Sequence, residues 1–193
     1  GVGATITIPG FGADDQGNLY AGTDAGAASD ADTCYNVAIG ASAGKSLNEG
    51  DQNVFIGCLA GCSLTSGGCG VYIGPKAGAN STTNSSSVFI GCEAGQNIRA
   101  DLNIAIGSGA LSAITTGDRC TAVGTYALQA NTGTYNVGVG MYALSANVAA
   151  QFNVALGYST LAANTTGEYN TAVGTYALDA NTTADYNNAF GYQ

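Results

Sequence analysis

The sequence has no histidine and no tryptophan, only 2 prolines, and only 4 lysine plus arginine residues among 193. Without histidine, neither a Ser-His-Asp triad nor a Cys-His pair can form, and the commonest side-chain ligand for transition metals is missing. With 13 acidic residues and a net charge of −9, the chain has little positive charge to bind nucleic-acid phosphates or anionic lipids. No segment approaches the roughly 18 apolar residues that span a bilayer. We therefore expect no enzyme activity, cofactor, metal, nucleic-acid partner or membrane insertion.

What the sequence does contain is glycine, 30 residues of it, with 46% hydrophobic and only 9% charged residues. A disordered chain would carry more charge and fewer apolar residues. Collagen needs glycine at every third position together with abundant proline, and a helical domain would not spread so many glycines through its interior. The composition predicts a repetitive β structure.

A repeat of about 17 residues runs through most of the chain, and such a period indicates a repeat architecture. Segment 170–178 (NTAVGTYAL) nearly repeats segment 121–128 (TAVGTYAL) and resembles segment 36–40 (NVAIG). Aligned on one glycine, the units are 16 to 18 residues long, with ten full repeats and an incomplete eleventh unit at 187–193. We assign residues 1–17 to an N-terminal extension and residues 18–193 to the repeat array. The aligned glycines, which we call the corner glycines, are Gly22, Gly40, Gly57, Gly74, Gly91, Gly107, Gly124, Gly140, Gly157, Gly174 and Gly191.

Each unit predicts a strand, a corner, a second short strand and a loop. Val or Ile usually stands three places before the corner glycine, and an apolar residue stands directly before it, so both side chains share one strand face. The glycine permits a tight corner, and loops such as NTTG at 164–167 are rich in turn formers. A unit this small cannot form a core alone, so the coils must stack, with a rise of about 4.8 Å. The predicted fold is an all-β parallel β-solenoid, or β-roll, of about ten 16–18-residue coils that assembles as a homo-oligomer.

Asparagine stands four places before the corner glycine in eight of the eleven units. We interpret this column as an amide ladder in which each side chain bonds to the neighbouring coil. Its members are Asn18, Asn36, Asn53, Asn103, Asn136, Asn153, Asn170 and Asn187.

Two positions of the unit also vary together. A large residue two places before the corner glycine accompanies Gly four places after it, as in Phe55 with Gly61, whereas later units pair a small residue with Leu, as in Ala122 with Leu128. We infer that the two side chains share one space, so their total volume is conserved. The unit with Ala38 and Gly44 is small at both positions, and Leu47 is a candidate to fill that gap.

The six cysteines are even in number, which in a low-charge chain of extracellular type favours disulfides. Cys62 and Cys69 flank a short loop and are the best intrachain pair; interchain bridges and free buried thiols are the alternatives. A zinc site at Cys58, Cys62 and Cys69 would need a fourth ligand. Calcium at Asp14 and Asp15 is a further alternative to solvated loop acids.

Other loop residues are candidates for contact with carbohydrate. Tyr126, Tyr142 and Tyr176 recur two places after the corner glycine, where they form either a packing stripe or a platform for sugar rings. The sequons are either good turn sequences or sites of N-glycosylation, and they begin at Asn80, Asn84, Asn164 and Asn181.

The repeats resemble those of a known family. Segments 36–44 (NVAIGASAG) and 103–107 (NIAIG) are similar to the head repeats of YadA-like trimeric autotransporter adhesins, and the later units with NTTG loops are similar to repeats of phage tail-fibre proteins. The resemblance implies a trimer of parallel left-handed β-rolls, located outside the cell, on a cell surface or in a virion fibre, whose task is attachment to a host receptor or surface glycan. We accordingly predict a non-catalytic fibre or adhesin segment.

An alternative function is a self-assembling extracellular filament. An open coil exposes unpaired backbone groups that can template another strand. The N-terminal strand of one subunit would then complete the open C-terminal coil of the next, head to tail. The residues of this strand are Ala4, Thr5, Ile6, Thr7 and Ile8.

Overall fold

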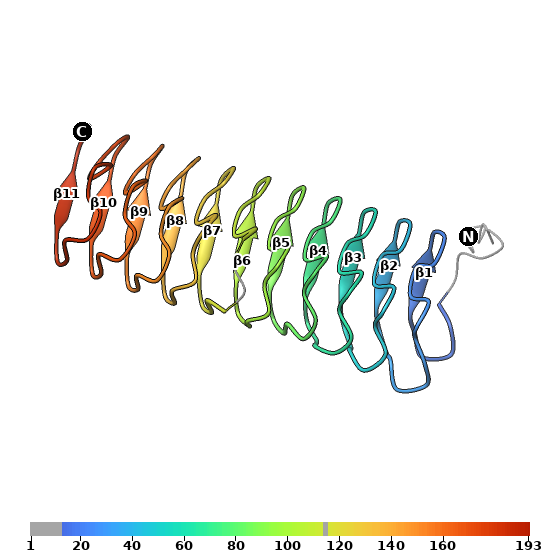
Figure 1. Ribbon diagram of the computed structural model, residues 1–193. Coiled ribbons are helices and arrows are strands. Elements are labelled where there is room, and N and C mark those ends of the chain that lie inside the picture. Colours follow the sequence, from blue (N-terminus) through green and yellow to red (C-terminus); the bar gives the residue numbers. More distant parts are fainter. Residues whose placement is uncertain (1–12, 114–115) are drawn as a thin grey trace, which may run out of the picture.

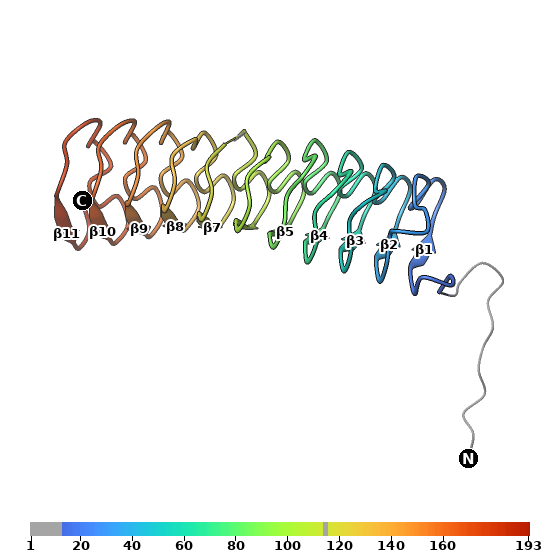
Figure 2. The same ribbon diagram turned by 90° about the horizontal axis from the view of Figure 1, so that it is seen from below.

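The computed structural model describes residues 13–113 and 116–193, which wind into a single elongated solenoid (Figures 1 and 2). Each coil contributes one three-residue strand, and the strands pair in sequence order into one eleven-stranded sheet in which all neighbours are parallel. The predicted all-β parallel solenoid is thereby confirmed. The strands are β1 (Leu19–Ala21), β2 (Val37–Ile39), β3 (Val54–Ile56), β4 (Val71–Ile73), β5 (Val88–Ile90), β6 (Ile104–Ile106), β7 (Thr121–Val123), β8 (Val137–Val139), β9 (Val154–Leu156), β10 (Thr171–Val173) and β11 (Asn188–Phe190).

The sheet register follows the corner glycines. Val37 pairs with Val54 and Phe55 pairs with Tyr72, so equivalent residues of the repeat lie side by side in every coil. A side chain does not fit at the corner glycines. Gly57, for example, has φ +130°, and a Cβ there would lie 2.7 Å from the backbone of Gly74. Alanine at this column would therefore clash with the next coil.

The prediction of a second strand after each corner is wrong. Here the backbone forms turns, with left-handed residues such as Tyr126 (φ 56°) and Leu128 (φ 51°). Hydrogen bonds between coils persist without strand geometry, because the Tyr126 N–H donates to Ser108 O (3.0 Å) and the Leu128 N–H donates to Ala143 O (2.9 Å). The alternating left-handed residues bend the chain back quickly enough to close a coil of about 17 residues.

The β-branched residues of each strand face outward. In β2, the middle residue Ala38 is fully buried, while Val37 and Ile39 on either side are only partly covered. The interior of so narrow a coil has room for one side chain per strand. The pair of apolar residues that the repeat conserves therefore forms the outer face of the sheet.

The interior confirms the inferred exchange of volume. A Cβ on Gly61 would lie 2.3 Å from the Phe55 ring, so the large residue of this unit fills the space at its glycine position. In a later unit, Ala122 and Leu128 are both fully buried, and Leu128 lies 3.1 Å from the Cβ position of Gly138. The exceptional unit is filled from its neighbour, because the Phe55 ring lies 2.9 Å from the Cβ position of Gly44. Leu47 is also buried in this core.

The proposed N-terminal strand at residues 4–8 lies outside the described residues. The described part begins with Ala13, which forms an antiparallel bridge with Leu19. Among residues 13–113 and 116–193, no helix has the length and apolarity needed to cross a membrane.

Candidate functional site

The asparagine column forms hydrogen bonds from coil to coil inside the solenoid. Asn153 is representative: it is fully buried, its Oδ1 accepts the Asn170 N–H (2.9 Å), and its Nδ2 donates to Gly167 O (2.8 Å). Each amide thus satisfies a backbone donor and a backbone acceptor that would otherwise be buried without partners. This column fixes the register of the coils.

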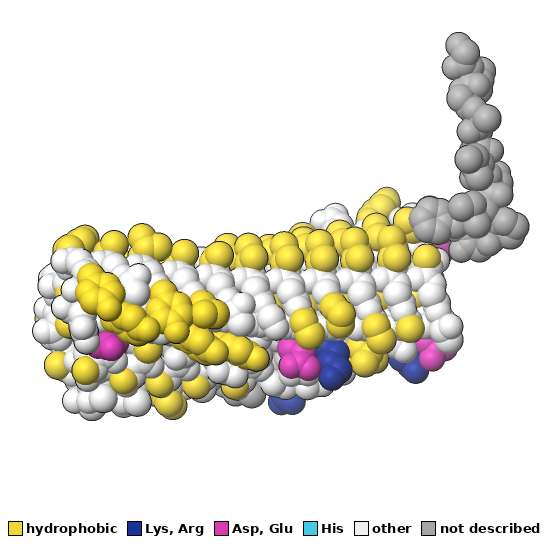
Figure 3. Space-filling view, turned by 90° about the horizontal axis from the view of Figure 1, so that it is seen from above, with side chains coloured by type: hydrophobic (Ala, Val, Ile, Leu, Met, Phe, Trp, Pro, Cys, Tyr) yellow, Lys and Arg dark blue, Asp and Glu magenta, His cyan; other side chains and the backbone are white. Residues whose placement is uncertain are grey.

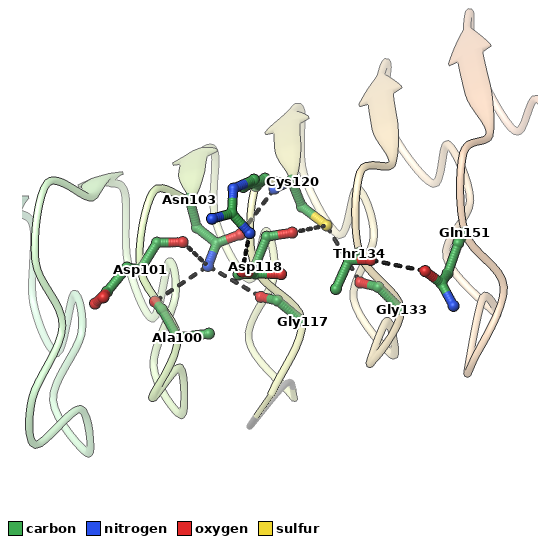
Figure 4. Close-up of polar contacts among 10 residues, drawn as sticks. Ala100, Asp101, Asn103, Gly117, Asp118, Cys120, Gly133, Thr134 and Gln151 are labelled. Carbon is green, nitrogen blue, oxygen red and sulfur yellow. Dashed lines mark hydrogen bonds and ion pairs between the residues drawn. The ribbon is translucent and has the colours of Figure 1, made fainter.

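Where asparagine is absent from the column, other residues take over its bonds (Figure 4). Cys120 is nearly fully buried; its N–H donates to Asn103 Oδ1 (2.9 Å) and its thiol donates to Gly133 O (3.3 Å). Burial raises the pKa of this thiol, so it stays protonated and able to donate. In the coil where Ser87 occupies the column, the Asn84 Nδ2 donates to Ala100 O (2.7 Å) in place of a column asparagine.

A second buried asparagine column, which the sequence analysis missed, stands seven places after the corner glycine in the C-terminal half. Asn164 donates to Asn147 Oδ1 (3.2 Å) and to Gly167 O (2.9 Å), the carbonyl that Asn153 also contacts. The signal was present in the sequence, because these residues recur every 16 or 17 positions. The members of this column are Asn131, Asn147, Asn164 and Asn181.

This burial corrects two of the four predicted glycosylation sites. Asn84 and Asn164 are fully buried and their amides form hydrogen bonds inside the solenoid, so neither can carry a glycan in the folded chain. Asn181 is partly buried and bonded to Asn164 (3.1 Å), whereas Asn80 is exposed. Only Asn80 has the open environment that a glycan requires.

The structure does not contain the predicted disulfide between Cys62 and Cys69. Both thiols are free, and they contact different coils: Cys62 lies 3.3 Å from Ala79 O and Cys69 lies 3.4 Å from Gln52 Oε1. In the described part of the chain, no three His, Cys, Asp or Glu side chains are grouped as a metal site would require, and no pocket is found.

Asp14, one of the acids considered for calcium, has a local structural role. Its carboxylate accepts the N–H groups of Gln16 (3.1 Å) and Asn18 (2.8 Å) and the Asn18 amide (3.1 Å). Burial alone would raise the pKa of Asp14, but these hydrogen bonds together lower it. Asp14 thereby orients the first asparagine of the ladder.

The outer face of the sheet is the largest candidate binding surface. Figure 3 shows apolar side chains arranged in rows along the rod, with few charged groups between them. Two rows come from the first and third residues of each strand, and they include Ile56 (38% exposed), Ile106 (37%) and Leu156 (46%). The parallel register keeps equivalent residues adjacent over all eleven strands, so the sheet face, as we call it, is continuous.

A stacked aromatic row borders the sheet face in the C-terminal half. Its residues stand five places before the corner glycine, and adjacent ring centroids lie 5.0–5.1 Å apart with interplanar angles of 6–11°. The Arg119 guanidinium lies 5.5 Å from the first ring. This row was also not predicted from the sequence, although its 17-residue spacing is visible there. Its members are Tyr135, Phe152, Tyr169 and Tyr186.

A second aromatic row follows the corners. Tyr126 and Tyr142 are stacked (5.7 Å), as the recurrence of tyrosine suggested, but the later neighbours are nearly perpendicular, such as Tyr158 with Tyr176 (5.3 Å, 88°). We call it the corner row; it comprises Tyr126, Tyr142, Tyr158, Tyr176 and Tyr192. These contacts fit the packing stripe, since each ring contacts the next along the row, one pair face to face and three pairs edge to face.

Comparison of the chain with protein-family models, with curated proteins and with solved structures gives no match.

Proposed function

We propose that this chain is a rigid, non-catalytic segment of an extracellular fibre or adhesin that assembles with copies of itself and mediates attachment. The observation that carries the proposal is the sheet face, in which the third residue is apolar in all eleven strands and the first residue is apolar in eight of them. Large exposed apolar patches are typical of interaction surfaces.

The dimensions of the sheet face suit a self-association surface. Ten strand spacings of about 4.8 Å give a length of about 48 Å. With a width of about 10 Å for the three residues of each strand, the area is on the order of 500 Å², more than half of the ~800 Å² that each partner buries in a stable interface. A second and third copy that present the same face would cover it.

The interior supports a mechanical role. Because each coil contacts only its neighbours, the rigidity of the rod depends on the bonds between coils. The buried asparagine columns add side-chain bonds to the backbone bonds at each of these junctions, as at Asn153 and Asn164.

Electron microscopy of the native assembly, combined with the intact mass of the denatured chain under reducing and non-reducing conditions, tests this proposal. We expect short rods that contain several parallel chains. Single isolated chains at all concentrations would contradict it. Long filaments that disappear when residues 1–10 are deleted would instead support head-to-tail assembly, and excess mass would indicate glycan.

A further inference from the structure

Two tyrosines of the stacked aromatic row are both exposed and in contact. The Tyr169 and Tyr186 ring centroids lie 5.1 Å apart with an interplanar angle of 6°, and the side chains are 44% and 72% exposed. The backbone holds them in register, since the Tyr186 N–H donates to Glu168 O (3.0 Å) and the Tyr169 N–H donates to Gln151 O (3.3 Å).

We propose that Tyr169 and Tyr186 form a site of oxidative cross-linking, at which a peroxidase-type oxidant couples the two phenols into dityrosine. Each phenol loses one electron and its hydroxyl proton to give a tyrosyl radical. The two radicals form one carbon–carbon bond between ring positions ortho to the hydroxyls, and the two ortho protons that are displaced restore both phenols. One molecule of hydrogen peroxide takes up two electrons and two protons and leaves as two molecules of water.

Parallel stacking favours this pair. Because the two rings are nearly parallel and their centroids are 5.1 Å apart, the ring edges that carry the ortho carbons lie close to one another. Rotation about the exposed side-chain bonds then brings the two carbons together without a change in the backbone. The product joins neighbouring coils covalently and resists their separation.

Other tyrosines meet the two requirements less well. In the corner row, Tyr126 and Tyr142 are stacked at 5.7 Å but are only 36% and 37% exposed, and the later neighbours are nearly perpendicular. Tyr35 is 67% exposed, but the equivalent residues in the adjacent coils are Gly17 and Gln52, so it has no phenol partner in its column. Tyr72 stacks on Phe55 and is fully buried. Phe152 lies between Tyr135 and Tyr169 at the same spacing but has no hydroxyl.

The test is oxidation of the dilute full chain by a haem peroxidase and hydrogen peroxide, followed by proteolysis and mass spectrometry. We expect a cross-linked peptide pair that contains Tyr169 and Tyr186 and has lost two hydrogen atoms. Tyr186→Phe should abolish this product, whereas Tyr135→Phe should leave its yield unchanged. Phe152→Tyr should add new cross-links to Tyr135 or Tyr169.

Circular dichroism of each variant verifies that the solenoid is intact. The proposal is overturned if oxidation couples other tyrosines but not this pair in the wild-type chain. It is likewise overturned if dityrosine arises only between separate chains, which a mixture of isotopically labelled and unlabelled protein distinguishes from coupling within one chain.

Discussion

At the scale of single residues, the asparagine side chains connect neighbouring coils. Replacement of Asn153 by Ala leaves the Asn170 N–H buried without an acceptor. We expect this variant to lose about 2–3 kcal/mol in free energy of unfolding, measured by chemical denaturation. Asn80→Ala is the matched control, because the Asn80 amide is exposed and bonds only to Asn97 (2.8 Å); it should change stability by about 0.5 kcal/mol or less. Equal losses would contradict the structural role of the ladder.

The hydroxyl of Tyr72 is an exception to this pattern of satisfied polar groups. It is buried between the Phe55 and Phe89 rings and has no hydrogen-bond partner among the described residues. Tyr72→Phe should therefore raise the free energy of unfolding by about 1 kcal/mol. Tyr20→Phe removes a hydroxyl that donates to Ser29 (2.8 Å) and should lower it by about 0.5–1.5 kcal/mol. A loss of stability in Tyr72→Phe would reveal a partner for this hydroxyl.

The same residue has a consequence at alkaline pH. Burial raises the pKa of the Tyr72 phenol far above its ordinary value of 10.0. The unfolded chain therefore releases this proton first, and stability falls as pH rises above about 10. We expect the stability advantage of Tyr72→Phe over the wild type to be constant at lower pH and to increase above that point. Denaturation curves at several alkaline pH values measure it, and an advantage that stays constant throughout would contradict the assignment.

At the scale of one coil, two positions share a single space. Gly61→Leu would drive a side chain into the Phe55 ring, and Phe55→Ala alone would leave a cavity that costs about 3–5 kcal/mol. The double variant Phe55→Ala/Gly61→Leu reproduces the pairing of Ala122 with Leu128, which has the same left-handed backbone at Leu128. It should be at least about 2 kcal/mol more stable than the sum of the single effects predicts. A double-mutant cycle with additive effects would show that the two sites are independent.

Much of this coil could be predicted from the sequence. The glycine spacing locates every strand, and all eleven strands end on the residue directly before a corner glycine. The direction of the strand faces could not be predicted in this way, because alternation tells which residues share a face but not which face is inside. The turn after the corner was missed because Thr-Tyr-Ala-Leu has ordinary strand propensities, and its left-handed residues are held by bonds to neighbouring coils.

The candidate surface, too, could be predicted only in part from the sequence. Three tyrosines of the corner row recur two places after the corner glycine and were visible as a repeat. Tyr158 and Tyr192 belong to the same row but stand only one place after the corner glycine. The cysteines were paired by their proximity in sequence, whereas in a solenoid the nearest neighbours of a side chain are about 17 residues away. The sequons fit both a loop and a buried column, and only burial distinguishes them.

At the scale of the whole molecule, the sheet face should control association. Ile106→Lys places a charge in the centre of this face, where burial against another copy would be costly. We expect the assembly to dissociate, as measured by sedimentation velocity, whereas Thr83→Lys, on an exposed loop, should leave it intact. Dissociation by both variants would indicate a general charge effect, and dissociation by neither would exclude the sheet face as the interface.

The parallel, residue-for-residue register also makes the rod modular. Removal of residues 141–157 joins Gly140 to Tyr158 and brings Asn136 next to Asn170 in the column, so the junction repeats contacts that already exist elsewhere in the chain. The rod would become shorter by one strand spacing, about 4.8 Å, while every remaining coil kept equivalent neighbours. The length of such a protein can therefore change in discrete steps by duplication or loss of one short stretch of coding sequence.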